Sequence, residues 1–103
     1  MMAARHYFAR TEDGYHVDDP SHVALVVLIN ELNHVDNTFI TIQPAIGDPG
    51  WHASVSLRED DTYEVVCRDD LRQDHRISSL TDPGRVADDL SSWLAGCVAD
   101  TTP

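Results

Sequence analysis

The stretch that decides the fold is WHASVSLREDDTYEVVCR, residues 51–68, because apolar and polar residues alternate in it on both sides of an acidic turn. Side chains of a strand alternate between two faces, so each half places its apolar residues on one side: Trp51, Ala53, Val55 and Leu57, then Tyr63, Val65 and Cys67. The stretch therefore predicts an antiparallel hairpin with one buried and one solvated face, turning at Glu59-Asp60-Asp61.

A second hairpin is expected near the start of the chain. His6 to Thr11 and Tyr15 to Val17 are rich in β-forming residues, and they flank Glu12-Asp13-Gly14. An Asp-Gly pair between such runs favours a tight turn, because glycine accepts a positive φ without steric cost. We expect this hairpin to be anchored by its aromatic side chains, Tyr7, Phe8 and Tyr15.

Two segments each begin with a suitable N-cap residue and continue with apolar residues, which predicts two helices. Asp19 suits an N-cap and Pro20 the first helical position, which predicts a mostly buried helix that ends near His34. Asp82-Pro83 repeats the arrangement before a second, amphipathic helix. The apolar stripe of that helix consists of Val86, Leu90, Trp93, Leu94, Cys97 and Val98.

The remaining alternating segments complete an α+β fold. Residues 37–43 form a further strand, a loop follows from Pro44 to Gly50, and Arg76 to Leu80 form an optional last strand. The predicted order is β-β-α-β-β-β-(β)-α, a mainly antiparallel sheet of four to six strands with both helices on one face. The length of 103 residues suits a single domain, residues 1–103, with residues 1–4 and 100–103 frayed.

The net charge of the chain limits the classes of macromolecule that it is expected to bind. The chain carries 18 acidic residues against 7 bases, all of them arginine, for a formal net charge of −11. Phosphate contacts need Lys and Arg, so direct binding to nucleic acid or to an anionic membrane is not expected, whereas a basic protein partner is compatible. The same composition also fits a host preference for Asp and Arg. With no signal peptide and no long apolar run, we expect a cytoplasmic protein.

Two acidic loops are the candidate partner-binding residues: Glu59, Asp60 and Asp61 in one, and Asp69, Asp70 and Asp74 in the other. Because they follow adjacent strands, we expect them to form one acidic patch, the alternative being ordinary solvated turns. They lack the alternating ligands and central glycine of a calcium-binding EF-hand loop. A second candidate binding surface is the polar face of the sheet, which carries His52, Arg58, Glu64 and Arg68. The alternative is that this face is only solvated, with a cross-strand ion pair between Arg58 and Glu64.

Catalytic and metal chemistry have little support in the sequence. His16, Asp18 and His22 are weak metal-ligand candidates, although Asp18 and His22 also suit an exposed first helical turn. Cys67 and Cys97 are expected to be reduced core thiols, and Trp51 and Trp93 core anchors. We expect no cofactor and no enzymatic activity.

The layout resembles a known class of proteins. Asp19 to Val23, then TFITI at residues 38–42, Trp51, and Tyr63-Glu64-Val65 before a closing amphipathic helix are similar to small immunity proteins of bacterial polymorphic-toxin systems. This resemblance implies an acidic α+β domain that neutralises a basic toxin or nuclease. Two other hypotheses remain open: a general interaction module, including a homodimer formed through the sheet edge or the sheet face, and a small metal-binding protein.

Overall fold

The computed structural model describes residues 6–45 and 50–101, and it has the predicted α+β architecture. All six strands are present, the optional last one included, in the expected order with the helices. The elements are β1 (Tyr7–Thr11), β2 (His16–Asp18), α1 (His22–Asn30), β3 (Phe39–Pro44), β4 (Trp51–Leu57), β5 (Tyr63–Asp69), β6 (Asp74–Leu80) and α2 (Pro83–Thr101).

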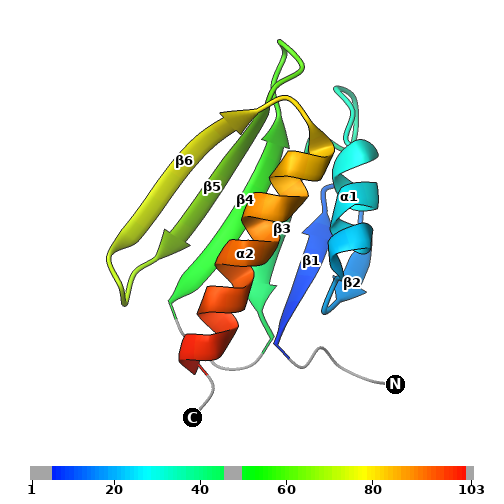
Figure 1. Ribbon diagram of the computed structural model, residues 1–103. Coiled ribbons are helices and arrows are strands. Elements are labelled where there is room, and N and C mark those ends of the chain that lie inside the picture. The colour runs from blue at the N-terminus through cyan, green and yellow to red at the C-terminus, as the bar shows by residue number, and fades with distance from the viewer. Residues whose placement is uncertain (1–5, 46–49, 102–103) are drawn as a thin grey trace.

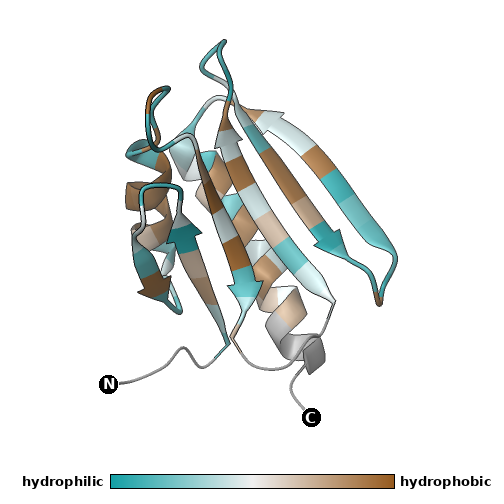
Figure 2. Ribbon diagram, turned by 180° about the vertical axis from the view of Figure 1, so that it is seen from behind, coloured by the Kyte–Doolittle hydropathy of each residue, from teal (hydrophilic) through white to brown (hydrophobic). Residues whose placement is uncertain are grey.

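The strands form one antiparallel sheet in the order β2-β1-β3-β4-β5-β6. Both helices lie on one face: α2 crosses the middle of the sheet, and α1 lies beside it over the β1–β2 side (Figure 1). Seen from behind, the other face of the sheet carries no helix among the described residues (Figure 2). The two faces of the sheet therefore meet different surroundings, one packed and one open.

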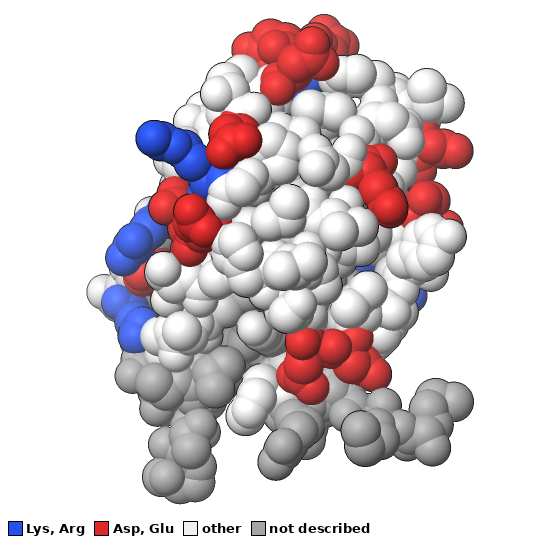
Figure 3. Space-filling view, turned by 45° about the vertical axis from the view of Figure 1, so that its right-hand side comes forward, with Lys and Arg blue, Asp and Glu red and all other residues white. Residues whose placement is uncertain are grey.

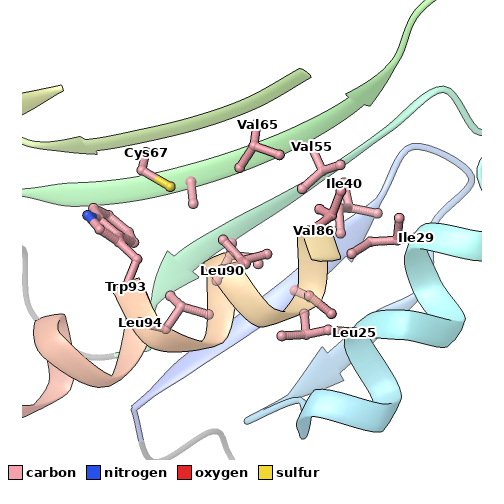
Figure 4. Close-up of a cluster of buried hydrophobic side chains, with 14 of the residues drawn as sticks. Leu25, Ile29, Ile40, Val55, Val65, Cys67, Val86, Leu90, Trp93 and Leu94 are labelled. Atoms are coloured by element: carbon pink, nitrogen blue, oxygen red, sulfur yellow. The ribbon is translucent and has the colours of Figure 1, made fainter. Parts of the chain in front are cut away.

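The central hairpin has the alternation that its sequence predicts. Val55 pairs with Val65 and Ala53 with Cys67, and all four side chains are buried. α2 covers them with its own apolar stripe, of which Val86, Leu90, Trp93, Leu94 and Cys97 are buried (Figure 4). This sheet-on-helix packing forms the hydrophobic core.

Aromatic side chains close one end of this core. The rings of Trp51 and Trp93 meet edge to face with centroids 5.9 Å apart, and Tyr7 meets Trp51 in the same way at 6.3 Å. Edge-to-face contacts are a favourable geometry for aromatic rings. Both tryptophans are buried, so the prediction that they anchor the core is confirmed.

The predicted cap of α2 is confirmed, whereas that of α1 is wrong. Asp82 accepts the backbone N–H of Arg85 at its Oδ2 (3.3 Å). At α1 the N-cap is Ser21, whose Oγ accepts the N–H of Ala24 (3.2 Å). Asp19 has φ +45°, and its carboxylate accepts the N–H groups of the β1 segment, from His6 at 2.9 Å and Tyr7 at 3.2 Å. It closes the first hairpin and does not begin the helix.

α1 is also shorter and less buried than predicted, since it ends at Asn30 and not near His34. The side chain of Asn33 accepts the N–H groups of Val35 (2.8 Å) and Asp36 (3.0 Å), and these bonds bend the chain into a turn. Such local side-chain bonds compete with helix continuation. Only part of the helix surface faces the core, through Leu25, Leu28 and Ile29.

The first hairpin forms as predicted, with Gly14 at φ +105° in its turn. Its aromatic anchoring is only partly as expected: Tyr7 packs on the core and Phe8 stacks on His16 at 4.7 Å, but Tyr15 is exposed. At the other terminus α2 continues to Thr101. Residues 1–4, 102–103 and most of the loop before Gly50 lie outside the described residues.

Candidate functional site

The two acidic loops lie at opposite ends of the molecule, so the prediction of one acidic patch is wrong. One loop precedes β5 and the other follows it, and the two ends of this seven-residue strand lie about 20 Å apart. Figure 1 shows the β4–β5 turn at one end of the sheet and the β5–β6 turn at the other. Consecutive turns of an antiparallel sheet necessarily alternate between its two ends.

At the β5–β6 turn the carboxylates are neutralised by arginines. Asp70 pairs with Arg68 (2.8 Å between Oδ1 and Nε), and Asp74 with Arg76 (3.3 Å). Asp69 is buried, and its carboxylate meets Arg72 through the backbone N–H at 3.3 Å and Nε at 3.8 Å. We name this region the paired turn; its members are Arg68, Asp69, Asp70, Arg72, Asp74 and Arg76.

At the opposite end four connections bring carboxylates together. Glu12 Oε1 accepts the N–H and hydroxyl of Thr38, each at 2.8 Å, which ties the β1–β2 turn to the start of β3. His34 in the α1–β3 loop contacts Asp61 in the β4–β5 turn at 2.8 Å. We name this region the acidic end; its carboxylates are Glu12, Asp13, Asp36, Glu59, Asp60, Asp61 and Asp82.

Positive charge at the acidic end is sparse among the described residues. Arg58 follows β4 there, but its guanidinium is bonded to Glu64 on the neighbouring strand. Arg85 lies in the first turn of α2, and the exposed Arg10 lies next to the last residue of β1. The carboxylates of this end therefore keep a negative field that the paired turn lacks.

The pKa of Tyr63 reports this field, and hydrogen bonds set the pKa values of two carboxyl groups at the same end. The pKa of Tyr63 is raised by burial and further by the negative charges of Asp61 and Asp82. Hydrogen bonds from Thr38 lower the pKa of Glu12, and those from Thr62 lower the pKa of Asp60. Both carboxyl groups are therefore held ionised at the acidic end.

Beside the acidic end, α1 exposes a stripe of valine that the sequence analysis missed. Val23 is 70% exposed and Val27 is 49% exposed. The two residues are one helical turn apart, so they lie on the same side of the helix. Glu31 lies one further turn along this line, toward the acidic end, and is exposed. We name Val23 and Val27 the α1 face.

The surroundings of the α1 face are acidic. At its start His22 contacts Asp88 of α2 at 2.6 Å. Figure 3, in which the α1 side of the molecule is turned forward, shows an uncharged central surface with acidic side chains above, below and to the right of it. The group at the top of that view belongs to the β4–β5 turn, the highest part of the molecule in Figure 1. The exposed Val23 and Val27 in these charged surroundings fit the usual anatomy of a protein-binding surface, an apolar core within a polar rim.

The polar face of the sheet holds the second predicted surface. His52 lies opposite Arg68 in the strand register, and Arg68 opposite His75 of β6. The expected Arg58–Glu64 ion pair is present at the acidic end of the same face. These side chains lie on the helix-free side, and the structure carries no feature that selects a partner for them.

The weak metal candidates are held apart. His16 contacts Asp18 at 2.7 Å on the open side of β2, whereas His22 points to α2 and Asp88. Asp18 belongs to β2 and not to the first turn of α1 as predicted. Within residues 6–45 and 50–101, no three His, Cys, Asp or Glu side chains are grouped as a metal site.

A groove of about 320 Å³ runs between α2 and the β5–β6 hairpin. Cys67 and Trp93 contribute to its lining, with Arg76 and Asp74 on the strand side and Asp89 on the helix side. Burial raises the pKa of the Cys67 thiol to about 11, so the thiol stays protonated at neutral pH and is a poor nucleophile. Both cysteines are buried thiols outside any disulfide, as predicted.

Sequence comparison adds no assignment: no protein family, curated protein or solved structure matches this chain. Across the described residues, neither helix combines the length and the apolar character that crossing a membrane requires.

Proposed function

We propose that this chain is a non-catalytic protein-binding domain that engages a basic partner through the α1 face and the acidic end. The observation that carries the proposal is the sorting of charge and apolar surface. Exposed valines adjoin carboxylates that keep their negative field, whereas the acidic groups of the paired turn are neutralised within the chain.

The two parts of this surface supply different terms of the binding free energy. Full burial of an exposed valine contributes about 1.5–3 kcal/mol, so the α1 face supplies affinity. Exposed carboxylates contribute less each, but they accelerate the encounter with a positively charged partner and set its orientation. A basic partner with an aliphatic side chain between its arginines or lysines fits both parts.

The more specific form of the proposal is an immunity or inhibitor protein that neutralises a basic toxin or nuclease. A nuclease presents cationic side chains to the phosphates of its substrate. The carboxylates of the acidic end attract those side chains in place of the nucleic acid. The resemblance in layout to small immunity proteins and the sign of the charge support this form.

The test uses a defined probe, a peptide of alternating arginine and leucine, and a matched pair of double variants. Glu59→Gln with Asp61→Asn removes two charges from the acidic end; Asp70→Asn with Asp74→Asn removes two from the paired turn. At about 0.5 kcal/mol for each exposed charge, we expect the first pair to weaken binding about fivefold at low salt. The second pair is expected to change the affinity less than twofold.

A third variant separates the apolar part. Val23→Ser with Val27→Ser removes the α1 face and keeps every charge. We expect weaker binding at low and at high salt, because apolar burial is not screened by ions, whereas the effect of the charge variants fades as salt is added. Equal losses from the two charge variants, or an unaffected valine variant, would contradict the proposal.

A further inference from the structure

β6 is the exposed edge of the sheet. It pairs with β5 along all seven of its residues, and on its other side it has no strand within the described chain. The opposite edge, β2, has only three residues. A long edge strand presents a row of unpaired backbone N–H and C=O groups, which is a template for pairing with another strand.

The residue at the centre of this edge is apolar. Ile77 is 62% exposed and lies opposite Val66 of β5, on the helix-free face of the sheet. The strand contains no proline and no bulge in its register. Proline, bulges and short length are devices that keep edges from pairing, and β6 lacks them.

The charge along this edge is balanced. Asp74 and Arg76 form an ion pair with each other, and His75 is the other ionisable residue of the strand. The molecule as a whole carries −11, so a second copy is repelled by most of the surface. β6 adjoins the arginines of the paired turn, which reduce this repulsion locally.

We infer that β6 pairs antiparallel with β6 of a second copy, about a two-fold axis at Ile77, to give one continuous sheet. In this register the two Ile77 side chains face each other and extend the apolar contact with Val66 across the axis. Arg76 lies opposite the partner's Ser78, His75 opposite the partner's Ser79, and Asp74 opposite the partner's Leu80. No like charges are directly opposed, and Arg76 keeps the ion pair with its own Asp74.

The pairing leaves the α1 face open. The α1 face lies over the β1–β2 side of the sheet, at the edge opposite β6 (Figure 1). The dimer therefore presents two copies of the α1 face, one at each end of the continuous sheet. The inference is independent of the proposed function, and each can fail without the other.

Sedimentation velocity over a concentration series tests the pairing. The chain is expected to shift from one to two copies as its concentration rises toward about 1 mM, where an interaction of about 4 kcal/mol is half-saturated. Added salt is expected to favour the dimer by screening the net charge of the two copies. A single monomeric species up to this concentration, in low and in high salt, would overturn the inference.

Two matched variants locate the interface. Ile77→Lys places a charge at the centre of the edge, and we expect at least a tenfold loss of dimer affinity with an unchanged melting temperature, since Ile77 is largely outside the core. Leu71→Lys adds the same charge to a somewhat more exposed apolar residue in the β5–β6 turn, outside β6, and is expected to dimerise like the parent chain. Equal behaviour of the two variants would place the contact elsewhere. Binding of the arginine–leucine peptide by monomeric Ile77→Lys keeps the two proposals distinguishable.

Discussion

The two turns at the ends of β5 are both rich in acidic residues, but one is negatively charged and the other is close to neutral. The β4–β5 turn carries Glu59, Asp60 and Asp61, whose field remains, while the β5–β6 turn carries acidic residues that arginines neutralise. The difference lies in which carboxylate each arginine bonds. At the β5–β6 turn Arg68 bonds to Asp70 and Arg76 to Asp74, in each case a carboxylate two residues away in the same turn region.

At the β4–β5 turn the nearest arginine is used elsewhere. Arg58 bonds across the hairpin to Glu64, which leaves the turn itself acidic. A count of acidic residues therefore does not locate a negative surface. The positions and bonding partners of the arginines decide which acidic turn stays negative.

The largest expected stability difference between the turns comes from removing a carboxylate at each. Asp69→Ala removes a buried carboxylate that meets Arg72 and accepts its backbone N–H, so we expect a loss of about 1–3 kcal/mol. Glu59→Ala changes an exposed turn residue and is expected to cost less than about 0.5 kcal/mol. Urea unfolding of the two variants measures both losses of unfolding free energy. Equal losses would contradict the claim that the β5–β6 turn holds its carboxylates more tightly than the β4–β5 turn does.

Removing charge from the acidic end and from the paired turn is expected to change the free energy of unfolding by smaller amounts and in opposite directions. Removing charge from the acidic end with Asp36→Asn and Glu59→Gln relieves repulsion and should raise the free energy of unfolding by a few tenths of a kcal/mol at low salt. Asp70→Asn with Asp74→Asn breaks ion pairs and should lower it by about 0.5 kcal/mol. Thermal melts at low and high salt measure these changes. Salt-independent shifts of the same sign in both variants would argue against the comparison.

Tyr63 provides a local probe of the acidic end. Asp61→Asn removes one of the two negative charges that raise its pKa, so the pKa is expected to fall toward its usual value while burial keeps part of the shift. Asp70→Asn, at the far end of β5, should leave it unchanged. An NMR titration of the labelled tyrosine ring measures both, and the account fails here if Asp70→Asn moves the pKa as much as Asp61→Asn.

The smallest effect concerns Glu12, whose pKa is lowered by its hydrogen bonds to Thr38. A carboxyl group with a lowered pKa in the folded state stabilises the fold above its unfolded pKa, and this contribution is lost as the pH falls through the folded value. Glu12→Gln is therefore expected to lower stability slightly at pH 7 and to make no difference at pH 2. Unfolding curves at the two pH values provide the check, and a variant equally destabilised at both would contradict it.

Much of the fold follows from local sequence, and the exceptions have identifiable causes. The alternation at residues 51–68 predicts the central hairpin because one of its faces must be buried. The start of α1 could not be predicted in this way: Asp19 and Ser21 are both suitable caps, and Asp19 is taken by β1, a contact between segments distant in sequence.

The candidate site was predictable in part. Of the two predicted acidic loops, the β4–β5 turn belongs to the acidic end and the β5–β6 turn does not. The expected strand order would have placed the β5–β6 turn at the opposite end, because consecutive turns of an antiparallel sheet alternate between its ends. The α1 face also left a signal in the sequence. Leu25, Leu28 and Ile29 already form a complete buried stripe, so Val23 and Val27 fall on the opposite side of the helix. The pairing of α1 with its neighbours, such as His22 with Asp88, depends on tertiary packing and had no such signal.

The most direct test of the account is a map of amide chemical shifts as the arginine–leucine peptide is titrated into the isotopically labelled chain at low salt. The account predicts that the shifts concentrate on α1, the α1–β3 loop and the β4–β5 turn, and that the paired turn at the other end of β5 stays silent. Shifts of equal size at both turns, or shifts centred on the paired turn, would contradict the claim that the sorting of charge creates the binding surface.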